Sequence, residues 1–208
     1  MFTLYGRANS SNVRKVLWLC GEIGLEGYER LDFGRGFKPL DSPDYAKINP
    51  NMLVPTFVEG DLVLWESNAI LRYLAAKHGP EEIYPRNFAA RAKVEMWLDW
   101  QLTTLLTGVR QLFQGLHVKI PAYTAPEQLE RAGHQATNSM EILDANLAGT
   151  GGYVAGGTFT IADCAVGMFV HRWYALPIER KEFPALEAYY ERLKERAPFR
   201  KWILDQGV

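Results

Sequence analysis

Apolar positions follow two different patterns along this chain, and the change falls near residue 80. Before it, short apolar runs that favour strands alternate with segments in which apolar residues recur every three or four positions. After it, only the helical repeat continues. The pattern predicts an α/β domain at residues 1–78, a proline-containing linker at residues 79–87 and an all-helical domain at residues 88–208.

The first domain opens with a β-α-β pattern. Phe2–Tyr5 and Tyr28–Phe33 have strand composition, and Asn12–Gly24 between them has one apolar helical face. Two strands joined in this way run parallel with a right-handed crossover. A short helix is expected after Ser42-Pro43, because proline is favoured at the first position of a helix.

A β-β-α pattern completes this domain. Thr56–Val58 and Leu62–Trp65 flank Glu59-Gly60-Asp61, a turn sequence that joins antiparallel strands. A helix is then expected from Ser67 to His78, and Gly79-Pro80 ends it.

The second domain is predicted to contain two long amphipathic helices, antiparallel to each other, followed by shorter ones. A third helix is expected to begin at Thr160-Ile161-Ala162-Asp163, a capping box in which Asp replaces the usual Glu or Gln, with Phe159 and Cys164 as a hydrophobic staple. The apolar repeats are Val94, Trp97, Leu98, Leu102, Leu105, Val109, Leu112, Phe113 and Leu116; Leu129, Ala132, Ala136, Met140, Leu143 and Leu147; Leu186, Tyr189, Tyr190 and Leu193; and Phe199, Trp202 and Ile203.

Composition narrows the classes of partner. The 208 residues carry a formal net charge of -1 and a pI near 6.4, so neither nucleic acid nor an anionic membrane surface is an expected partner. No apolar stretch approaches the roughly 18 residues that span a bilayer, and the N-terminal residues lack the pattern of a signal peptide. We therefore expect a cytoplasmic protein.

Cysteine and histidine spacing indicates neither a disulfide framework nor a metal site. Cys20 and Cys164 lie far apart within apolar helical patterns, which is typical of reduced, buried thiols. The four histidines have no close mutual spacing, so no metal is expected.

Two stretches about ten residues apart indicate a binding site. Val54-Pro55 stands directly before a strand-like run, where proline is tolerated at the first residue or at an edge and is often cis, which predicts an exposed backbone corner. Ser67 stands at the start of a helical pattern, with Glu66 immediately before it. A carboxylate next to a helix N-terminus suits a small zwitterion.

Across essentially its whole length the chain resembles the soluble glutathione transferases. Tyr5-Gly6 followed by Ser10–Val16 is similar to the serine motif of the phi and theta-like classes. Asn49–Pro55 resembles the thioredoxin-type cis-proline loop, Glu66-Ser67 the γ-glutamyl clamp, and Thr160–Asp163 the capping box of the family's core helix. The resemblance, to a serine-type bacterial member, implies a thioredoxin-like glutathione-binding domain followed by a helical bundle, and a homodimer that acts in detoxification.

The resemblance makes Ser10 the expected catalytic residue. Its hydroxyl would stabilise the glutathione thiolate and thereby lower the thiol pKa, with the helix N-terminus behind it. The alternative is that Ser10 only caps the first helix, because Ser is a favoured N-cap. Ser11 competes for the catalytic role, and Asn12 offers a side-chain N–H to the sulfur.

The resemblance also implies which residues bind the other groups of glutathione. Glu66 suits the ammonium of the γ-glutamyl end, and Ser67 with the adjacent N–H groups suits its carboxylate, although Ser67 also qualifies as a simple cap. The backbone of Val54 would pair with the cysteinyl unit as an added strand. Many relatives carry Gln or Lys just before the Val-Pro pair, where this chain has Leu53. Lys38 is our candidate for the glycyl carboxylate.

The implied function is conjugation of the glutathione thiolate, as co-substrate, to a small hydrophobic electrophile. Aromatic candidates for the electrophile pocket are Phe37, Phe113, His117 and Trp173, with Tyr174, although aromatic residues at helical spacing more often pack in the core.

Alternatives remain open at this stage: a glutathione-dependent peroxidase or disulfide reductase, or a non-catalytic binding module with the same fold. A reductase that uses Cys20 is disfavoured by its position deep in a helix. His117 and His171 are expected to satisfy core polar groups, and Asp99 lies either at a dimer interface or on the polar edge of its helix. No spacing identifies the electrophile.

Overall fold

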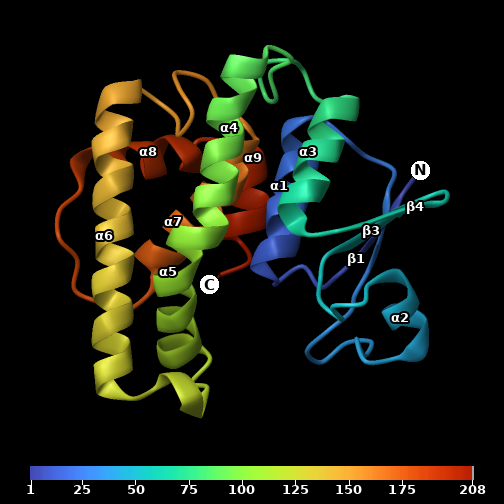
Figure 1. Ribbon diagram of the computed structural model, residues 1–208, viewed down its shortest axis with the longest axis horizontal. Coiled ribbons are helices and arrows are strands. Elements are labelled where there is room, and N and C mark those ends of the chain that lie inside the picture. Colours follow the sequence, from blue (N-terminus) through green and yellow to red (C-terminus); the bar gives the residue numbers. More distant parts are fainter. Residues whose placement is uncertain (208) are drawn as a thin grey trace.

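A computed structural model describes residues 1–207, and Val208, the last residue of the predicted helical domain, lies outside the described residues. Its two parts lie side by side in Figure 1, the sheet at the right and the long helices at the left. The predicted fold class, a thioredoxin-like α/β part followed by a helical part, is confirmed.

Four short strands form one mixed sheet. They are β1 (Thr3–Tyr5), β2 (Glu29–Leu31), β3 (Thr56–Glu59) and β4 (Leu62–Trp65), in the order β2-β1-β3-β4. The parallel pairing of β1 with β2 confirms the predicted crossover, and the other pairings are antiparallel. Because Tyr5 pairs with Leu31 on one side and Thr56 on the other, the end of β1 meets the start of β3.

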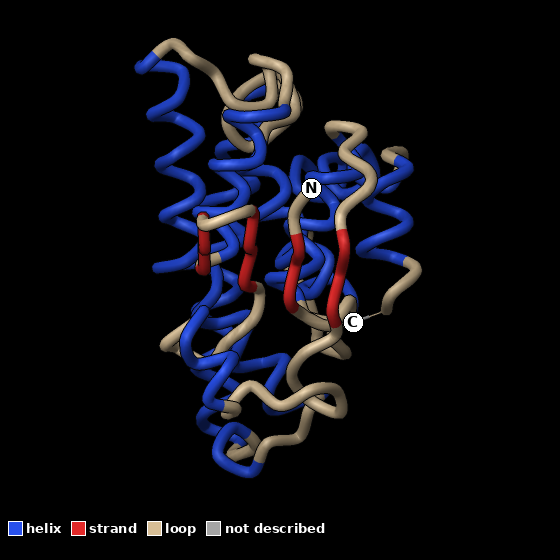
Figure 2. Tube along the Cα trace, turned by 90° about the vertical axis from the view of Figure 1, so that its right-hand side faces the viewer, coloured by secondary structure: helices blue, strands red, loops and turns tan. Residues whose placement is uncertain are grey.

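Three helices accompany the sheet: α1 (Ser11–Glu22), α2 (Pro43–Ile48) and α3 (Ser67–His78). The bounds of α3 coincide with the predicted ones. Ser42 caps α2 by accepting a hydrogen bond from the backbone N–H of Tyr45 at 3.3 Å. Helices α1 and α3 stand between the sheet and the helical part, as Figures 1 and 2 show together, and both contact α7.

The first long repeat forms one continuous rod with two π-helical turns. It consists of α4 (Phe88–Trp100), η1 (Gln101–Leu105), α5 (Leu106–Leu112) and η2 (Phe113–His117). After a short 3-10 turn, η3 (Pro121–Tyr123), the chain returns antiparallel as α6 (Pro126–Thr150), as predicted (Figure 1). Gly108 allows this close packing, because a Cβ there would lie 2.6 Å from the backbone nitrogen of Ala136.

Helix α7 (Ile161–Ala175) lies at the centre of the molecule and is buried on all sides over most of its length. Its predicted capping box is confirmed: Asp163 accepts from the backbone N–H of Thr160 at 2.8 Å. The same carboxylate accepts from the N–H of Val154 at 2.9 Å and from the hydroxyl of Tyr189 at 3.1 Å, and burial raises its pKa to about 6. The chain ends with α8 (Pro184–Lys194), α9 (Ala197–Phe199) and η4 (Arg200–Leu204).

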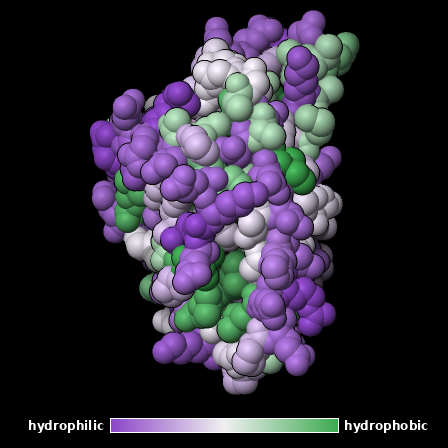
Figure 3. Space-filling model, turned by 90° about the vertical axis from the view of Figure 1, so that its left-hand side faces the viewer, coloured by the Kyte–Doolittle hydropathy of each residue, from purple (hydrophilic) through white to green (hydrophobic). Residues whose placement is uncertain are grey.

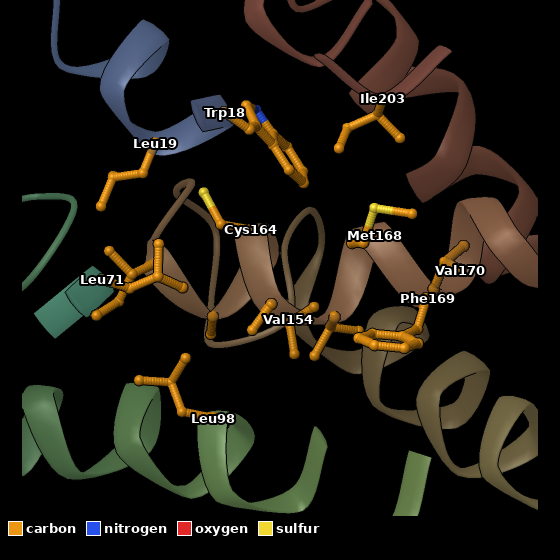
Figure 4. Packing of buried hydrophobic residues seen from close by; sticks show 14 of the residues in the cluster. Trp18, Leu19, Leu71, Leu98, Val154, Cys164, Met168, Phe169, Val170 and Ile203 are labelled. Carbon is orange, nitrogen blue, oxygen red and sulfur yellow. The ribbon is translucent and has the colours of Figure 1, made fainter. Parts of the chain in front are cut away.

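One apolar core runs through both parts. Figure 4 shows Trp18 of α1 and Leu71 of α3 facing Cys164 and Met168 of α7. A Cβ at Gly167 would lie 2.9 Å from the Trp18 ring, so this glycine lets α1 and α7 approach closely. Cys164, like Cys20, is a buried free thiol.

Polar groups also join the two parts. The ammonium of Lys15, which is fully buried, donates to Asn68 Oδ1 of α3 at 2.8 Å and to Gln101 Oε1 of η1 at 3.2 Å. Asn68 in turn donates to the carbonyl of Leu98 at 2.9 Å. Burial lowers the pKa of Lys15 to about 7. These bonds fix the start of α3 against the helical rod.

The surface on the side of α6 is mainly hydrophilic, with an apolar area in its lower half (Figure 3). Within residues 1–207, none of the helices combines the length and the apolar character needed to span a bilayer.

Candidate functional site

A cavity of about 450 Å³ lies where the loop after β1, the start of α1 and the helical part meet. The sheet-containing part supplies Ser10, Ser11 and Asn12 together with Leu53 and Val54. The helical part supplies residues from α5, η2 and α7.

A smaller cavity of about 40 Å³ adjoins this one. It is lined by Glu66 and Ser67, and it shares Asn12, Leu53 and Val54 with the larger cavity. The structure therefore brings together Ser10, Asn12, Val54, Glu66 and Ser67, five of the residues that the sequence assigned to glutathione.

Ser10 occupies the N-cap position of α1 but makes no capping hydrogen bond with its side chain. The hydroxyl is half-buried, lines the larger cavity and has no partner among residues 1–207. The neighbouring Ser11 hydroxyl instead accepts a hydrogen bond from Arg172 Nη1 at 3.0 Å. Of the two hydroxyls, that of Ser10 has no hydrogen-bond partner within residues 1–207, whereas the oxygen of Ser11 is held by Arg172.

Helix α3 begins with an unusual backbone. Glu66, the residue before the helix, has φ 70° and ψ 113°, a left-handed conformation that is rare for a residue with a side chain. Its carboxylate is exposed and makes no capping bond, whereas Ser67 is 2% exposed. No other described residue bonds the Ser67 hydroxyl, so simple capping does not account for it. The N–H groups of Ser67 and Asn68 are also unpaired among residues 1–207, and unpaired N–H groups at a helix start can bind an anion.

Two buried residues, Tyr45 and Asn49, hold the loop of Leu53 and Val54 in place. The Val54-Pro55 peptide is cis. The carbonyl of Leu53 is turned inward, where it accepts from Asn49 Nδ2 at 2.8 Å and from the Tyr45 hydroxyl at 2.7 Å. Within the described chain, the N–H and carbonyl of Val54 have no hydrogen-bond partner. The loop therefore presents the main chain of Val54 to the cavity.

Gly6 permits the close approach of this loop. Its φ is 149°, and a Cβ there would lie 3.1 Å from the Cβ of Val54 and 2.5 Å from the side chain of Val13. Any larger residue would push the loop or α1 outward.

Aromatic groups form the wall on the helical side. The Phe113 ring stacks on the His117 ring with centroids 4.9 Å apart, and the Arg172 guanidinium carbon lies 3.6 Å from the Phe113 centroid. Leu106 and Phe169 complete the apolar surface. Phe113 and His117 thus lie where the electrophile pocket was predicted, on the π-helical turn η2.

Four other predicted residues line neither of these two cavities. Trp173 is 1% exposed, because consecutive residues on a helix point about 100° apart and Arg172 is the one that faces the cavity. Tyr174 stacks on Tyr190 at 4.6 Å. Phe37 and Lys38 lie on an exposed loop, with the Lys38 ammonium 5.6 Å from the Phe33 ring. The structure therefore places these residues apart from Ser10.

The larger cavity also contains residues that the sequence analysis missed. Leu106 and Arg110 precede Phe113 by seven and three residues, a helical spacing that could have indicated them. Phe169 and Arg172 are likewise three residues apart on one face of α7. Arg7 and Arg35 come from loops, where no periodicity indicates direction.

The remaining titratable candidates lie outside both cavities. His171 Nδ1 lies 2.8 Å from the Tyr190 hydroxyl, and burial lowers the His171 pKa to about 4, as expected of a histidine that satisfies a core polar group. Burial raises the pKa of Cys20 to about 12, which opposes a thiolate role. Asp99 is exposed and accepts from Arg72 Nη2 at 3.0 Å. Within residues 1–207, no three His, Cys, Asp or Glu side chains gather to hold a metal.

Comparison with known proteins gives a consistent result. Residues 1–76 match the model for the N-terminal domain of glutathione S-transferase, and residues 126–192 match the C-terminal domain model. The chain is 36% identical to glutathione S-transferase GstB of Escherichia coli K12, with 98% of each protein covered, and 30% identical to glutathione S-transferase 3 of Zea mays, with 96% and 92% covered.

A solved structure is similar over almost the whole chain. It is the theta class glutathione S-transferase of Xanthomonas axonopodis pv. citri with glutathione bound, with a TM-score of 0.90, 40% identity, and coverage of 98% of this chain and 97% of that one.

Proposed function

The chain belongs to the glutathione S-transferase family and is an enzyme that conjugates glutathione to electrophiles, and we propose that Ser10 is the residue that activates the glutathione thiol. The observation that carries this proposal is the free Ser10 hydroxyl at the start of α1, in a cavity that adjoins the one lined by Ser67.

The chemistry is stabilisation of an anion. A free thiol of this kind has a pKa of about 8.5, so only ~3% is ionised at pH 7. A donated hydrogen bond and the helix N-terminus favour the thiolate, and a fall of ~2 units would ionise roughly three quarters. Asn12 lies beside Ser10 and supplies a further N–H in this scheme.

The two ends of the tripeptide follow from the same arrangement. Glu66 holds the γ-glutamyl ammonium, and Ser67 with the unpaired N–H groups of α3 holds its carboxylate. The free main chain of Val54 pairs with the cysteinyl unit. For the glycyl carboxylate we propose the loop that carries Arg35, which lines the larger cavity, and Lys38.

Phe113 and His117 form the apolar surface on which the electrophile rests in this proposal, whereas Phe37 and Trp173 do not line it. We also propose that the enzyme is a cytoplasmic homodimer that uses no metal and binds neither nucleic acid nor membrane. Large apolar side chains exposed on α4 and β4 support a dimer: Phe88 is 85% exposed, Met96 57% and Trp65 41%. Sedimentation of the purified protein tests the oligomeric state.

The assignment of Ser10 is tested by titrating bound glutathione through thiolate absorbance, in the wild type and in Ser10→Ala. We expect the thiol pKa to rise toward 8.5 in the variant. An unchanged pKa would contradict the role of Ser10. A panel of chloroaromatics, epoxides, alkyl halides and hydroperoxides separates conjugation from a peroxidase activity.

A further inference from the structure

The side chains that line the larger cavity carry positive charge and no negative charge. Four arginines line it, Arg7, Arg35, Arg110 and Arg172, and none of its lining residues is Asp or Glu. The chain as a whole has a formal net charge of -1, so this concentration of positive charge is local. A cleft lined by charge of one sign attracts ligands of the opposite sign.

Arg172 is the most informative of the four. It is 5% exposed, and no carboxylate among the described residues forms an ion pair with it. Its Nη1 donates to the Ser11 hydroxyl, and its Nε has no partner in residues 1–207. A buried cation without a counter-charge is costly, unless a ligand supplies the charge.

The guanidinium of Arg172 is held in a fixed position. It stacks 3.6 Å from the centroid of Phe113, and its Nη2 makes no hydrogen bond to other described residues and is not among the fully enclosed side-chain atoms. A guanidinium that is immobilised in this way suits a carboxylate, to which Nη2 can donate a charge-assisted hydrogen bond.

Arg110 extends this positive surface. It lies one turn before Phe113 on the same side of the rod, is exposed, and makes no ion pair or side-chain hydrogen bond within residues 1–207. Arg7 and Arg35, by contrast, come from the glutathione-binding part, where the glycyl carboxylate needs a partner. Two of the four cations, Arg110 and Arg172, are thus left for the second substrate.

We propose that the electrophile of this enzyme carries a carboxylate, which Arg172 and Arg110 bind while its apolar part rests on Phe113. This proposal rests on the proposed function and specifies its substrate class. With a halide as leaving group, the glutathione sulfur attacks the carbon that bears the halogen. The C–S bond forms, the C–halogen bond breaks and the halide leaves with the bonding electrons. The thiol proton passes to solvent, and the carboxylate is unchanged.

The test compares two substrates that differ in this charge, a chlorodinitrobenzoate and its methyl ester. Each kcat/KM is divided by the rate constant of the uncatalysed reaction with glutathione, which removes the difference in intrinsic reactivity. We expect the wild type to favour the acid by about tenfold or more, the contribution of a charged hydrogen bond. Arg172→Gln and Arg110→Gln should each lower the acid-to-ester ratio several-fold.

Arg86→Gln serves as the matched control, because Arg86 is exposed and lines neither cavity of the site, and it should keep the wild-type ratio. Arg110 is exposed, so its variant decides the question even where Arg172→Gln fails to fold.

Two results would overturn the proposal. One is a wild type whose corrected kcat/KM is higher for the ester than for the acid. The other is that the arginine variants lower kcat/KM equally for both substrates, which would mean that the guanidinium acts on a step common to both. Turnover of neither substrate, together with no change in thiolate absorbance on adding glutathione, would instead contradict the proposed function itself.

Discussion

The two ends of the site use different kinds of chemical group. The smaller cavity, at the start of α3, is bounded by main-chain N–H groups, a cis-peptide loop and the carboxylate of Glu66. The larger cavity is bounded on its helical side by arginine and aromatic side chains from α5, η2 and α7. The first therefore combines main-chain and side-chain groups, whereas the helical side of the second is formed by side chains, each of which one substitution can change.

This difference separates what is constant in such an enzyme from what varies. Main-chain groups are present whatever the residue, so the contacts that they supply at the glutathione end tolerate sequence change provided that the loop and the helix start keep their conformations. The side chains of Ser10, Glu66 and Ser67 are the exceptions in our proposal. In our proposal the electrophile end depends on the identity of Phe113, Arg110 and Arg172. The predictions below test the contrast.

The largest effect is expected for Ser10. Ser10→Ala should lower kcat/KM at pH 7 by roughly 25-fold, because the ionised fraction of the thiol falls from about three quarters to ~3%. The loss should shrink as the pH rises above about 8.5, where the thiol ionises unaided. Ser11→Ala is the matched comparison, because that hydroxyl is already bonded to Arg172, and it should have the smaller effect. Equal losses in the two variants would contradict the assignment.

A smaller effect is expected at the other end of glutathione. Ser67→Ala should raise the KM for glutathione by roughly tenfold, the value of one charged hydrogen bond, and leave kcat within about twofold. Ser139→Ala is a suitable control, because Ser139 is 3% exposed but bonds only the carbonyl of Gln135 on its own helix. A loss that appears in kcat alone would count against a binding role.

The two ends of the site also differ in how much of their structure could be predicted from the sequence. The bounds of α3, the cap at Ser42 and the cis bond at Pro55 were all predictable, because each depends on a few adjacent residues. The free hydroxyls of Ser10 and Ser67 were not, because a Ser at a helix start has the same sequence context whether or not it caps.

At the electrophile end Phe113 and His117 were predicted, but the cavity face of the helices as a whole was not, for two physical reasons. Each π-helical turn adds a residue to the rod, so η1 and η2 rotate the faces that a single α-helical repeat predicts. Helix α7 is buried on all sides, so its apolar pattern does not distinguish the cavity side, that of Arg172, from the core side, that of Trp173.

A third prediction concerns the pH dependence of stability that arises from Lys15, which links the sheet-containing part to the helical part. The folded state releases the Lys15 proton near pH 7, whereas the unfolded chain keeps it up to about pH 10.5, so unfolding takes up a proton between these values. The free energy of unfolding should therefore rise with pH between 7 and 9, by up to about 1.4 kcal/mol per pH unit. Lys15→Met should remove this rise. Denaturant titrations at several pH values measure it, and an unchanged slope in the variant would exclude Lys15 as its source.

The smallest effect is expected for the thiols. Cys20→Ser should leave glutathione conjugation within about twofold of the wild type, because the Cys20 thiol is buried away from both cavities and its pKa is raised. Cys164→Ser is the control for the cost of a hydroxyl in the core. A loss of turnover in Cys20→Ser alone, at unchanged stability, would point to a thiol-dependent mechanism.

The contacts of Lys15 with Asn68 and Gln101 have a consequence for dividing the chain. Because this buried ammonium takes its acceptors from both sides of residues 79–87, a chain cut in that segment would leave each fragment with polar groups that only the other can satisfy. The C-terminal residues add to this dependence, since Arg14 of the first fragment donates to the carbonyls of Gln206 and Gly207 at 2.7 and 2.5 Å. The two halves should thus behave as complementing fragments that regain activity on mixing, and not as independent modules.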